Sequence, residues 1–202
     1  MSKNQEPERI EDIDHFPFIK GDIIDLCARN SKHAELYAKW KNDPVVRRYS
    51  RNVVPRTLDE QEKRSERNQE KFPEHISFEI WHKEDKKPLG IIGVGHIDWV
   101  SGWANAFIFI GEKEYWNKNV ATEATKLLLD YSFKELNLNK IHGGVAVKNV
   151  GSWSVAEKLG FKLEGIEKEE FYVDGEYLDH KTYCIFKEDW LKQKNKIYRI
   201  PS

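Results

Sequence analysis

Residues 111–124 of the chain read GEKEYWNKNVATEA and separate two segments with different patterns. Before them, residues 104–110 (ANAFIFI) form an apolar run that is typical of a strand. After them, apolar side chains recur at helical spacing from Val120 to Leu136, which predicts a helix with one apolar face. The first N–H groups of such a helix have no internal partner, and the helix dipole adds partial positive charge. The sequence therefore predicts an anion site here, for which pyrophosphate is a natural ligand.

Part of this stretch, residues 115–124 (YWNKNVATEA), resembles the signature YWGKGYATEA of GNAT-type N-acetyltransferases. The similarity is to the branch that acetylates ribosomal-protein N-termini and polyamines, where this loop holds the pyrophosphate of acetyl-CoA. Asn117 and Asn119 stand where the family usually has glycine, which allows positive φ and close approach to a ligand. Asparagine tolerates left-handed φ best among the other residues, which favours the same loop shape. Its amide could crowd the phosphates or donate hydrogen bonds to them.

A second stretch, residues 148–161 (KNVGSWSVAEKLGF), resembles the family pattern N-x-x-S-x-x-V-x-E-K-x-G-F. Asn149 or Ser152 can cap a short helix, and Gly160 is expected to close that helix in the left-handed conformation. Phe161 then begins the next strand. Two motifs at this separation are more specific than either motif alone.

The composition excludes several other classes of protein. The chain has 202 residues, enough for one domain with a substantial core. A formal net charge of −1 gives no basic field for nucleic acid, and no apolar run approaches the ~20 residues of a membrane helix. The N-terminus lacks the apolar core of a signal peptide. Cys27 and Cys184 are read as reduced thiols of a cytoplasmic protein, and no Cys/His cluster has metal-ligand spacing.

The remaining chain is predicted as one domain over residues 21–202, after a loose lead-in over residues 1–20. Ser31 and Thr57 are the predicted N-caps of two early helices. In the first half, the expected elements are a strand (23–28), two helices (31–42 and 57–72) and three strands (75–82, 89–99 and 103–110). These are followed by the helix over 120–136, a strand (141–147), the short helix within 148–161, two strands within 163–186 and a terminal helix (187–196). This order resembles the GNAT fold, an α+β sandwich whose mixed, mostly antiparallel sheet is splayed at the cofactor cleft.

The resemblance implies acetyl-CoA as co-substrate and assigns residues to it. The loop and helix start would hold the pyrophosphate, the end of the preceding strand would bind the pantetheine arm, and Asn149 would contact that arm from the other side. A backbone N–H of Ile108 or Phe109 would polarise the thioester. The cofactor-binding residues implied are Ile108, Phe109, Ile110, Trp116, Asn117, Lys118, Asn119, Val120, Ala121, Thr122, Asn149 and Ser152. Glu123, in the first helical turn, is expected to point away from the phosphates.

Ser152 is our candidate proton donor to the leaving thiolate, because Ala156 occupies the position where many family members have a tyrosine. Its competing interpretation is a helix cap. The candidate bases are Glu79, His96 and Asp98; the last two share strand parity and are expected to point to one face. Each could instead be an ordinary polar residue of a strand, with a water relay removing the proton.

Together, these features predict an acetyl-CoA-dependent N-acetyltransferase that acts on a primary amine, either a protein N-terminus or a small polyamine-like molecule. The alternative is a catalytically weakened or inactive GNAT-fold binding module, favoured by Asn117, Asn119, Phe107 and Ala156. We expect a cytoplasmic monomer or homodimer that binds neither nucleic acid nor membrane.

Overall fold

The computed structural model describes residues 15–50, 52–65 and 72–197. Its strands form one sheet in the order β1-β2-β3-β4-β5-β6-β8-β7, in which every pair is antiparallel except β5 with β6. The strands are β1 Pro17–Lys20, β2 Ile24–Cys27, β3 His75–His82, β4 Lys87–Asp98, β5 Trp103–Ile110, β6 Lys140–Ala146, β7 Lys162–Val173 and β8 Glu176–Phe186. The helices are α1 Ala34–Asn42, α2 Leu58–Ser65, α3 Val120–Lys134, α4 Val150–Lys158 and α5 Lys187–Ile197. The prediction of a mixed, mostly antiparallel sheet is confirmed.

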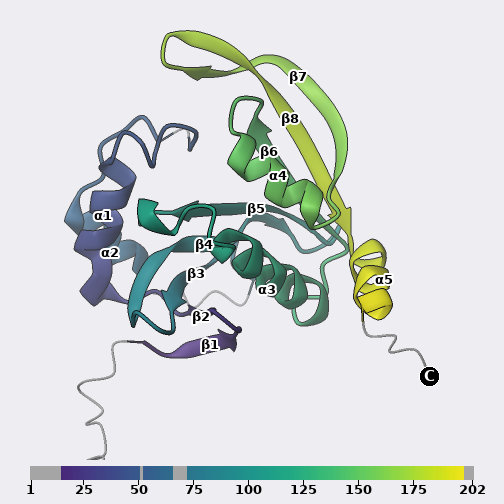
Figure 1. Cartoon of the computed structure of the whole chain (residues 1–202), viewed down its shortest axis with the longest axis horizontal. Helices are drawn as coiled ribbons and strands as arrows, with labels where there is room; N and C mark the ends of the chain where they lie inside the picture. The colour runs from purple at the N-terminus through teal and green to yellow at the C-terminus, as the bar shows by residue number, and fades with distance from the viewer. Residues whose placement is uncertain (1–14, 51, 66–71, 198–202) are drawn as a thin grey trace, which may run out of the picture.

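Helices cover both faces of this sheet (Figure 1). On one face, α3 buries Leu128 and Phe133 in the main core, together with Phe78 and Ile80 of β3. On the other face, α1 packs a smaller cluster that includes Trp40. Within the described residues, none of the helices has both the length and the apolar composition needed to cross a bilayer.

The two halves of the sheet separate between β5 and β6. These strands pair only where Trp103–Asn105 meets Lys140–His142. Beyond that point, residues 106–110 of β5 pair with β4 alone, and residues 143–146 of β6 pair with β8 alone. The facing backbone edge of β5 therefore stays open over the half of the strand that leads to Ile110, which confirms the expected splay.

The hairpin of β7 and β8 rises away from the rest of the sheet (Figure 1). Its turn lies at Asp174 and Gly175, as predicted, and both residues have positive φ (52° and 85°). Phe171, near the tip, packs in a small cluster with Tyr49 of the loop after α1. The Arg48 guanidinium also lies 2.5 Å from the Asp174 carboxylate. The hairpin and this loop therefore meet, although 126 residues separate them in the chain.

Two sequence predictions about the N-terminal part need correction. Residues 17–20, placed in the loose lead-in, form edge strand β1, where Pro17 is tolerated at the first position and Phe18 stacks near Phe78. Residues 1–14 lie outside the described residues. Ser31 is not the cap, because Asn30 Oδ1 accepts from the Lys32 N–H (3.0 Å) and a short 3₁₀ turn precedes α1.

The second predicted helix is confirmed in part. Thr57 Oγ1 accepts from the Glu60 N–H (3.2 Å), which is the predicted capping contact, and α2 follows. Its predicted end at residue 72 cannot be compared, because residues 66–71 lie outside the described part of the chain. Gly160 closes α4 with φ of +87°, as expected.

Candidate active site

A cleft of about 1930 Å³ opens over the separated strands. Its lining comes from β3, β5, residues 115–117 and 119–122, β6 with the start of α4, the loop after α1, and the β7–β8 hairpin. Lys118, a predicted cofactor contact, is not part of this lining. Pockets for one small molecule usually have about 300–1,000 Å³. This cleft therefore has room for a cofactor and a second substrate together.

The loop before α3 has the backbone shape of an anion site. Asn117 and Asn119 have φ of 62° and 63°, so both adopt the left-handed conformation that glycine provides in the family signature. Asn119 is the N-cap of α3 but makes no capping bond with its side chain, whose Oδ1 accepts from Lys158 Nζ instead (3.3 Å). The first N–H that bonds back to the cap is that of Glu123 (2.9 Å to Asn119 O). The N–H groups of residues 120–122 thus precede the helical hydrogen bonds and line the cleft.

Glu123 does not oppose an anion at this loop. Its Oε1 accepts from the backbone N–H groups of Asp22 (2.6 Å), Ile23 (2.9 Å) and Ile24 (3.3 Å). The carboxylate therefore points to the turn between β1 and β2, as expected, and it docks that turn on α3.

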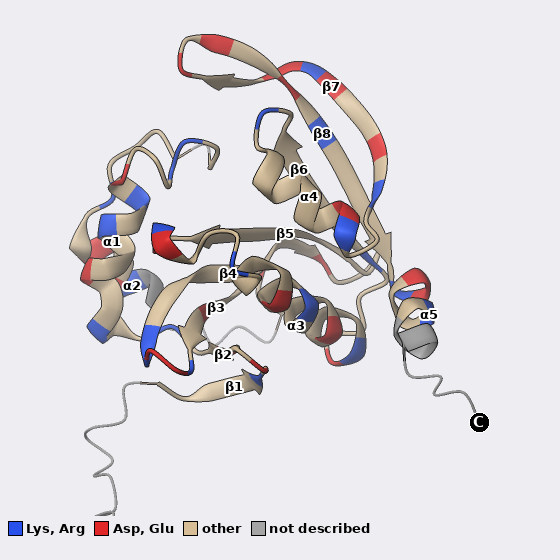
Figure 2. Cartoon of the chain, in the orientation of Figure 1, with Lys and Arg blue, Asp and Glu red and all other residues tan. Residues whose placement is uncertain are grey.

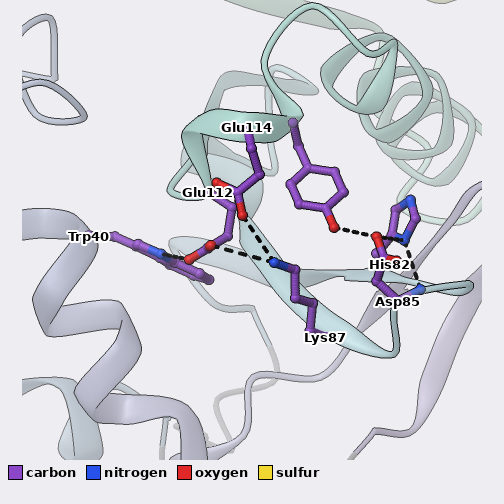
Figure 3. Close-up of polar contacts among 7 residues, drawn as sticks. Trp40, His82, Asp85, Lys87, Glu112 and Glu114 are labelled. Atoms are coloured by element: carbon purple, nitrogen blue, oxygen red, sulfur yellow. Dashed lines mark hydrogen bonds and ion pairs between the residues drawn. The ribbon is translucent and has the colours of Figure 1, made fainter.

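A polar network fixes the start of the loop against α1 (Figure 3). Trp40 Nε1 donates to Glu112 Oε1 (2.7 Å), while Lys87 Nζ lies 3.7 Å from Glu112 and 3.1 Å from Glu114. A Cβ on Gly111 would stand 2.1 Å from the Trp40 ring, so only glycine fits where β5 ends. These contacts set the direction in which the chain leaves β5.

The next residues attach the loop to the sheet. Tyr115, in the 3₁₀ turn η3 Lys113–Tyr115, donates to the Asp85 carboxylate, which also lies 3.0 Å from His82 (Figure 3). The hydrogen bond to Asp85 raises the pKa of the Tyr115 hydroxyl, with burial as a second cause. Trp116 Nε1 donates to the Ile110 carbonyl (2.9 Å). The segment that leads to the anion site is therefore hydrogen-bonded to Asp85 and to the end of β5 before it reaches Asn117.

Across the cleft, α4 presents Asn149 and Ser152. Asn149 is the N-cap through its backbone, without a side-chain capping bond, and its carbonyl accepts from the Ser152 N–H (3.1 Å). Ser152 is the third residue of the helix, so its interpretation as a cap is wrong. Both residues line the cleft. Ser152 therefore lies in the cleft lining, and its role as a proton donor remains a prediction.

The first candidate base, Glu79, lies outside the cleft. Its side chain is fully buried beneath α1, accepts from the Tyr37 hydroxyl and lies 2.7 Å from His33 Nδ1. Burial, with the Glu79 charge as a second cause, raises the pKa of the Tyr37 hydroxyl. The same two causes raise the pKa of the Cys27 thiol to about 12. Glu79 is thus a buried structural carboxylate, because α1 and the turn before it cover this face of β3.

The other two candidates, His96 and Asp98, are also placed away from the cleft. Asp98 Oδ1 accepts from the N–H groups of Ser101 (2.8 Å) and Val100 (3.0 Å) in the β4–β5 turn, and these bonds, chiefly that to Ser101, lower its pKa. His96 has φ of 50°, and the register shifts between Gly95 and Asp98. The parity argument fails because this irregularity interrupts the strand alternation.

The sequence analysis missed most of the charged cleft lining. These residues are Arg29, Lys41, Arg47, Arg48, Arg56, Lys148 and Lys158, with histidines His75 and His180. The pair at 47–48 was visible in the sequence, but nothing there indicated that the loop bends over the sheet. Tyr183, also in the lining, donates to Glu157 Oε1 (2.7 Å), and burial raises its pKa to about 12.

Comparison with known proteins gives consistent matches. A family model described as an acetyltransferase (GNAT) domain matches residues 26–162. The chain is 35% identical over 138 residues to a probable N-acetyltransferase, YjcK, of Bacillus subtilis (strain 168), covering 66% of this chain and 75% of that protein. It is 35% identical over 109 residues to spermidine N(1)-acetyltransferase of Escherichia coli (strain K12), covering 54% of this chain and 58% of that protein. The crystal structure of spermidine N-acetyltransferase from Vibrio cholerae in complex with CoA and spermine has a TM-score of 0.74 at 28% identity, covering 83% of this chain and 98% of that one.

Proposed function

The chain belongs to the GNAT family of N-acetyltransferases, and from this we propose that it moves the acetyl group of acetyl-CoA to a primary amine. The residues at the cleft fit the cofactor. The N–H groups at the start of α3 are suited to a pyrophosphate, and Glu123 is turned away from them. The similar Vibrio cholerae enzyme was crystallised with CoA.

The observation that supports this proposal most is the open edge of β5. Among the described residues, no strand pairs with residues 106–110 on the side of β6, and this edge leads directly to the anion loop. A pantetheine arm carries amide groups, which can complete this edge as a short pseudo-strand while the pyrophosphate occupies the loop. Ile108, Phe109 and Ile110 all line the cleft along this path.

The chemistry then needs few groups from the protein. The amine nitrogen attacks the thioester carbonyl carbon, the C–N bond forms, and the C–S bond breaks as the thiolate leaves. A backbone N–H of Ile108 or Phe109 would donate to the developing oxyanion. Ser152 would give its proton to the thiolate and regain a proton from solvent, while the amine proton passes to water or to a cleft histidine such as His75 or His180.

The inactive binding module loses part of its support. That alternative was favoured by Asn117, Asn119, Phe107 and Ala156, and the amides of the two asparagines could crowd the phosphates. Both asparagines have left-handed φ. We therefore keep acetyl transfer as the proposed function.

A thiol-release assay tests this proposal. Purified protein, acetyl-CoA and a panel of primary amines are mixed, free CoA is detected with a thiol reagent, and the acetylated amine is identified by mass spectrometry. We expect thiol release that depends on an amine and yields one acetamide for each thiol. Thiol release that is equal with and without every amine would reject N-acetyl transfer.

A further inference from the structure

The wall of the cleft on the side of α1 is cationic. Five side chains of this wall carry positive charge, and they come from the end of β2, from α1 and from the segment that follows α1: Arg29, Lys41, Arg47, Arg48 and Arg56. Among the described residues that line the cleft, there is no aspartate or glutamate. Figure 2 shows the basic segments on the loop after α1, close to the hairpin tip.

Where Arg48 and Arg56 contact a carboxylate, that carboxylate lies outside the cleft lining. Arg47 donates to the Asn52 carbonyl (3.3 Å), a neutral acceptor. Arg56 donates to Asn52 Oδ1 (3.0 Å) and lies 3.7 Å from Glu60, outside the cleft lining. Arg48 pairs with Asp174, but both side chains are at least half exposed, where such a pair contributes little.

These cations are distinct from those beside the anion loop. Lys158 contacts Asn119, and Lys148 pairs with Glu176, so both belong to the α4 side of the cleft. By contrast, Lys41 Nζ stands 5.6 Å from the centre of the Phe109 ring, on the open part of β5. A positive charge therefore lies close to the strand along which the thioester would be placed.

We propose that the acceptor of this enzyme is a primary amine that also carries a carboxylate or phosphate group, and not a polyamine. This inference rests on the proposed acetyl transfer. Arginine presents paired donors that match carboxylate and phosphate oxygens, so Arg47 and Arg56 can hold the anionic end. A second ammonium group near the reacting amine would meet this cationic wall, which disfavours polycations.

A matched series of acceptors tests this proposal. Putrescine, γ-aminobutyrate and aminopropyl phosphate have similar lengths but end in an ammonium, a carboxylate or a phosphate; spermidine is added as the polycation. We expect kcat/KM for at least one anionic amine to exceed that for putrescine and spermidine by about tenfold or more. A comparison of γ-aminobutyrate with aminopropyl phosphate identifies which anionic group the enzyme prefers. A preference for putrescine or spermidine would overturn the proposal.

Variants test whether the cationic wall causes the preference for anionic amines. Arg47→Gln should raise KM for the anionic acceptor about tenfold, with little change for putrescine and in acetyl-CoA affinity. Lys63→Gln is the matched control, because it removes one charge from the exposed face of α2, where Lys63 pairs with Asp59 (2.8 Å). An equal effect of Arg47→Gln on all acceptors, or a loss of acetyl-CoA binding, would assign this wall to the cofactor or to folding and contradict the proposal.

A failure of the proposed charge preference can be distinguished from a failure of acetyl transfer itself. If no acceptor turns over, the same four amines are titrated into the protein by calorimetry, with and without CoA. Tighter binding of the anionic amines supports the charge preference even then, and tighter binding of putrescine or spermidine overturns it.

Discussion

Asn117 and Asn119 adopt backbone angles at which most side chains collide with the following carbonyl oxygen. Their short amides tolerate these angles, so the residue type predicted the loop shape correctly from the sequence. The sequence did not predict the use of the Asn119 side chain, whose oxygen accepts from Lys158 on another helix. That contact depends on how α3 and α4 pack, and no local pattern encodes it.

Ser152 carries a prediction at the residue scale. Ser152→Ala should lower kcat about 100-fold, because the leaving thiolate loses its proton donor, while KM for acetyl-CoA stays within about threefold. Steady-state kinetics on the wild type and the variant check this. The matched control is Ser154→Ala on the same helix, where the hydroxyl already donates to the Gly151 carbonyl (3.2 Å). Equal kcat values for Ser152→Ala and the wild type would exclude Ser152 from proton transfer.

At the scale of elements, α3 does two things in its first turn: it exposes its N–H groups to the cleft and it anchors the β1–β2 turn through Glu123. Because three backbone donors share this charged acceptor, Glu123→Ala should reduce the free energy of unfolding by about 2 kcal/mol. Urea denaturation measures this loss. Affinity for acetyl-CoA should change less than about threefold.

Lys126→Ala is the control for Glu123, because Lys126 is an exposed residue of the same helix. The account of Glu123 fails if its replacement abolishes acetyl-CoA binding while stability is unchanged. That result would place the carboxylate at the ligand and not at the β1–β2 turn.

The elements also show what the sequence can and cannot predict. Strong periodicity and turn residues located α3, β3 and the hairpin turn within a few residues. Strand β1 was missed, since four residues that begin with proline carry little strand pattern and gain their stability from pairing with β2 and from Phe18 packing. The irregularity at His96 was equally invisible, and His96 and Asp98 lie where β4 pairs with residues 103–105, away from the open half of β5.

At the scale of the whole molecule, the two thiols lie in buried positions from opposite ends of the chain. Burial is the main cause that raises the pKa of Cys27 to about 12 and that of Cys184 to about 11. In the unfolded chain a thiol ionises near pH ~8.5. Stability from the protonated thiols is therefore fully present below about pH 8.5 and is lost as the pH rises toward the folded values, by at most about 1.4 kcal/mol per pH unit for each thiol.

Urea denaturation from about pH 8 to about pH 10 measures this dependence. The double variant Cys27→Ala/Cys184→Ala should be less stable at neutral pH, owing to two small cavities, but its stability should fall less steeply with pH. Parallel curves for wild type and variant would show that the thiols do not cause the alkaline loss.

The whole molecule also determines the charge of the site. The cleft brings together segments as distant as Arg48 and Asp174, and its cationic wall arises only when the loop after α1 lies beside the β7–β8 hairpin. A formal net charge of −1 for the chain gave no sign of this local excess. The fold and the cofactor loop could be predicted from motifs, whereas the acceptor side depends on long-range contacts that the motifs do not contain.

The account depends on the binding of a pyrophosphate by the first amides of α3 beside two asparagines. Calorimetric titration of acetyl-CoA into the wild type, Asn119→Asp and Asn119→Gly tests this most directly. We predict one site with micromolar affinity for the wild type and similar affinity for Asn119→Gly. Asn119→Asp should bind about tenfold more weakly, because its charge repels the phosphates, yet be about as stable, because its carboxylate can still accept from Lys158. No heat and no thermal shift with the wild type, together with binding restored by Asn119→Gly, would contradict the account.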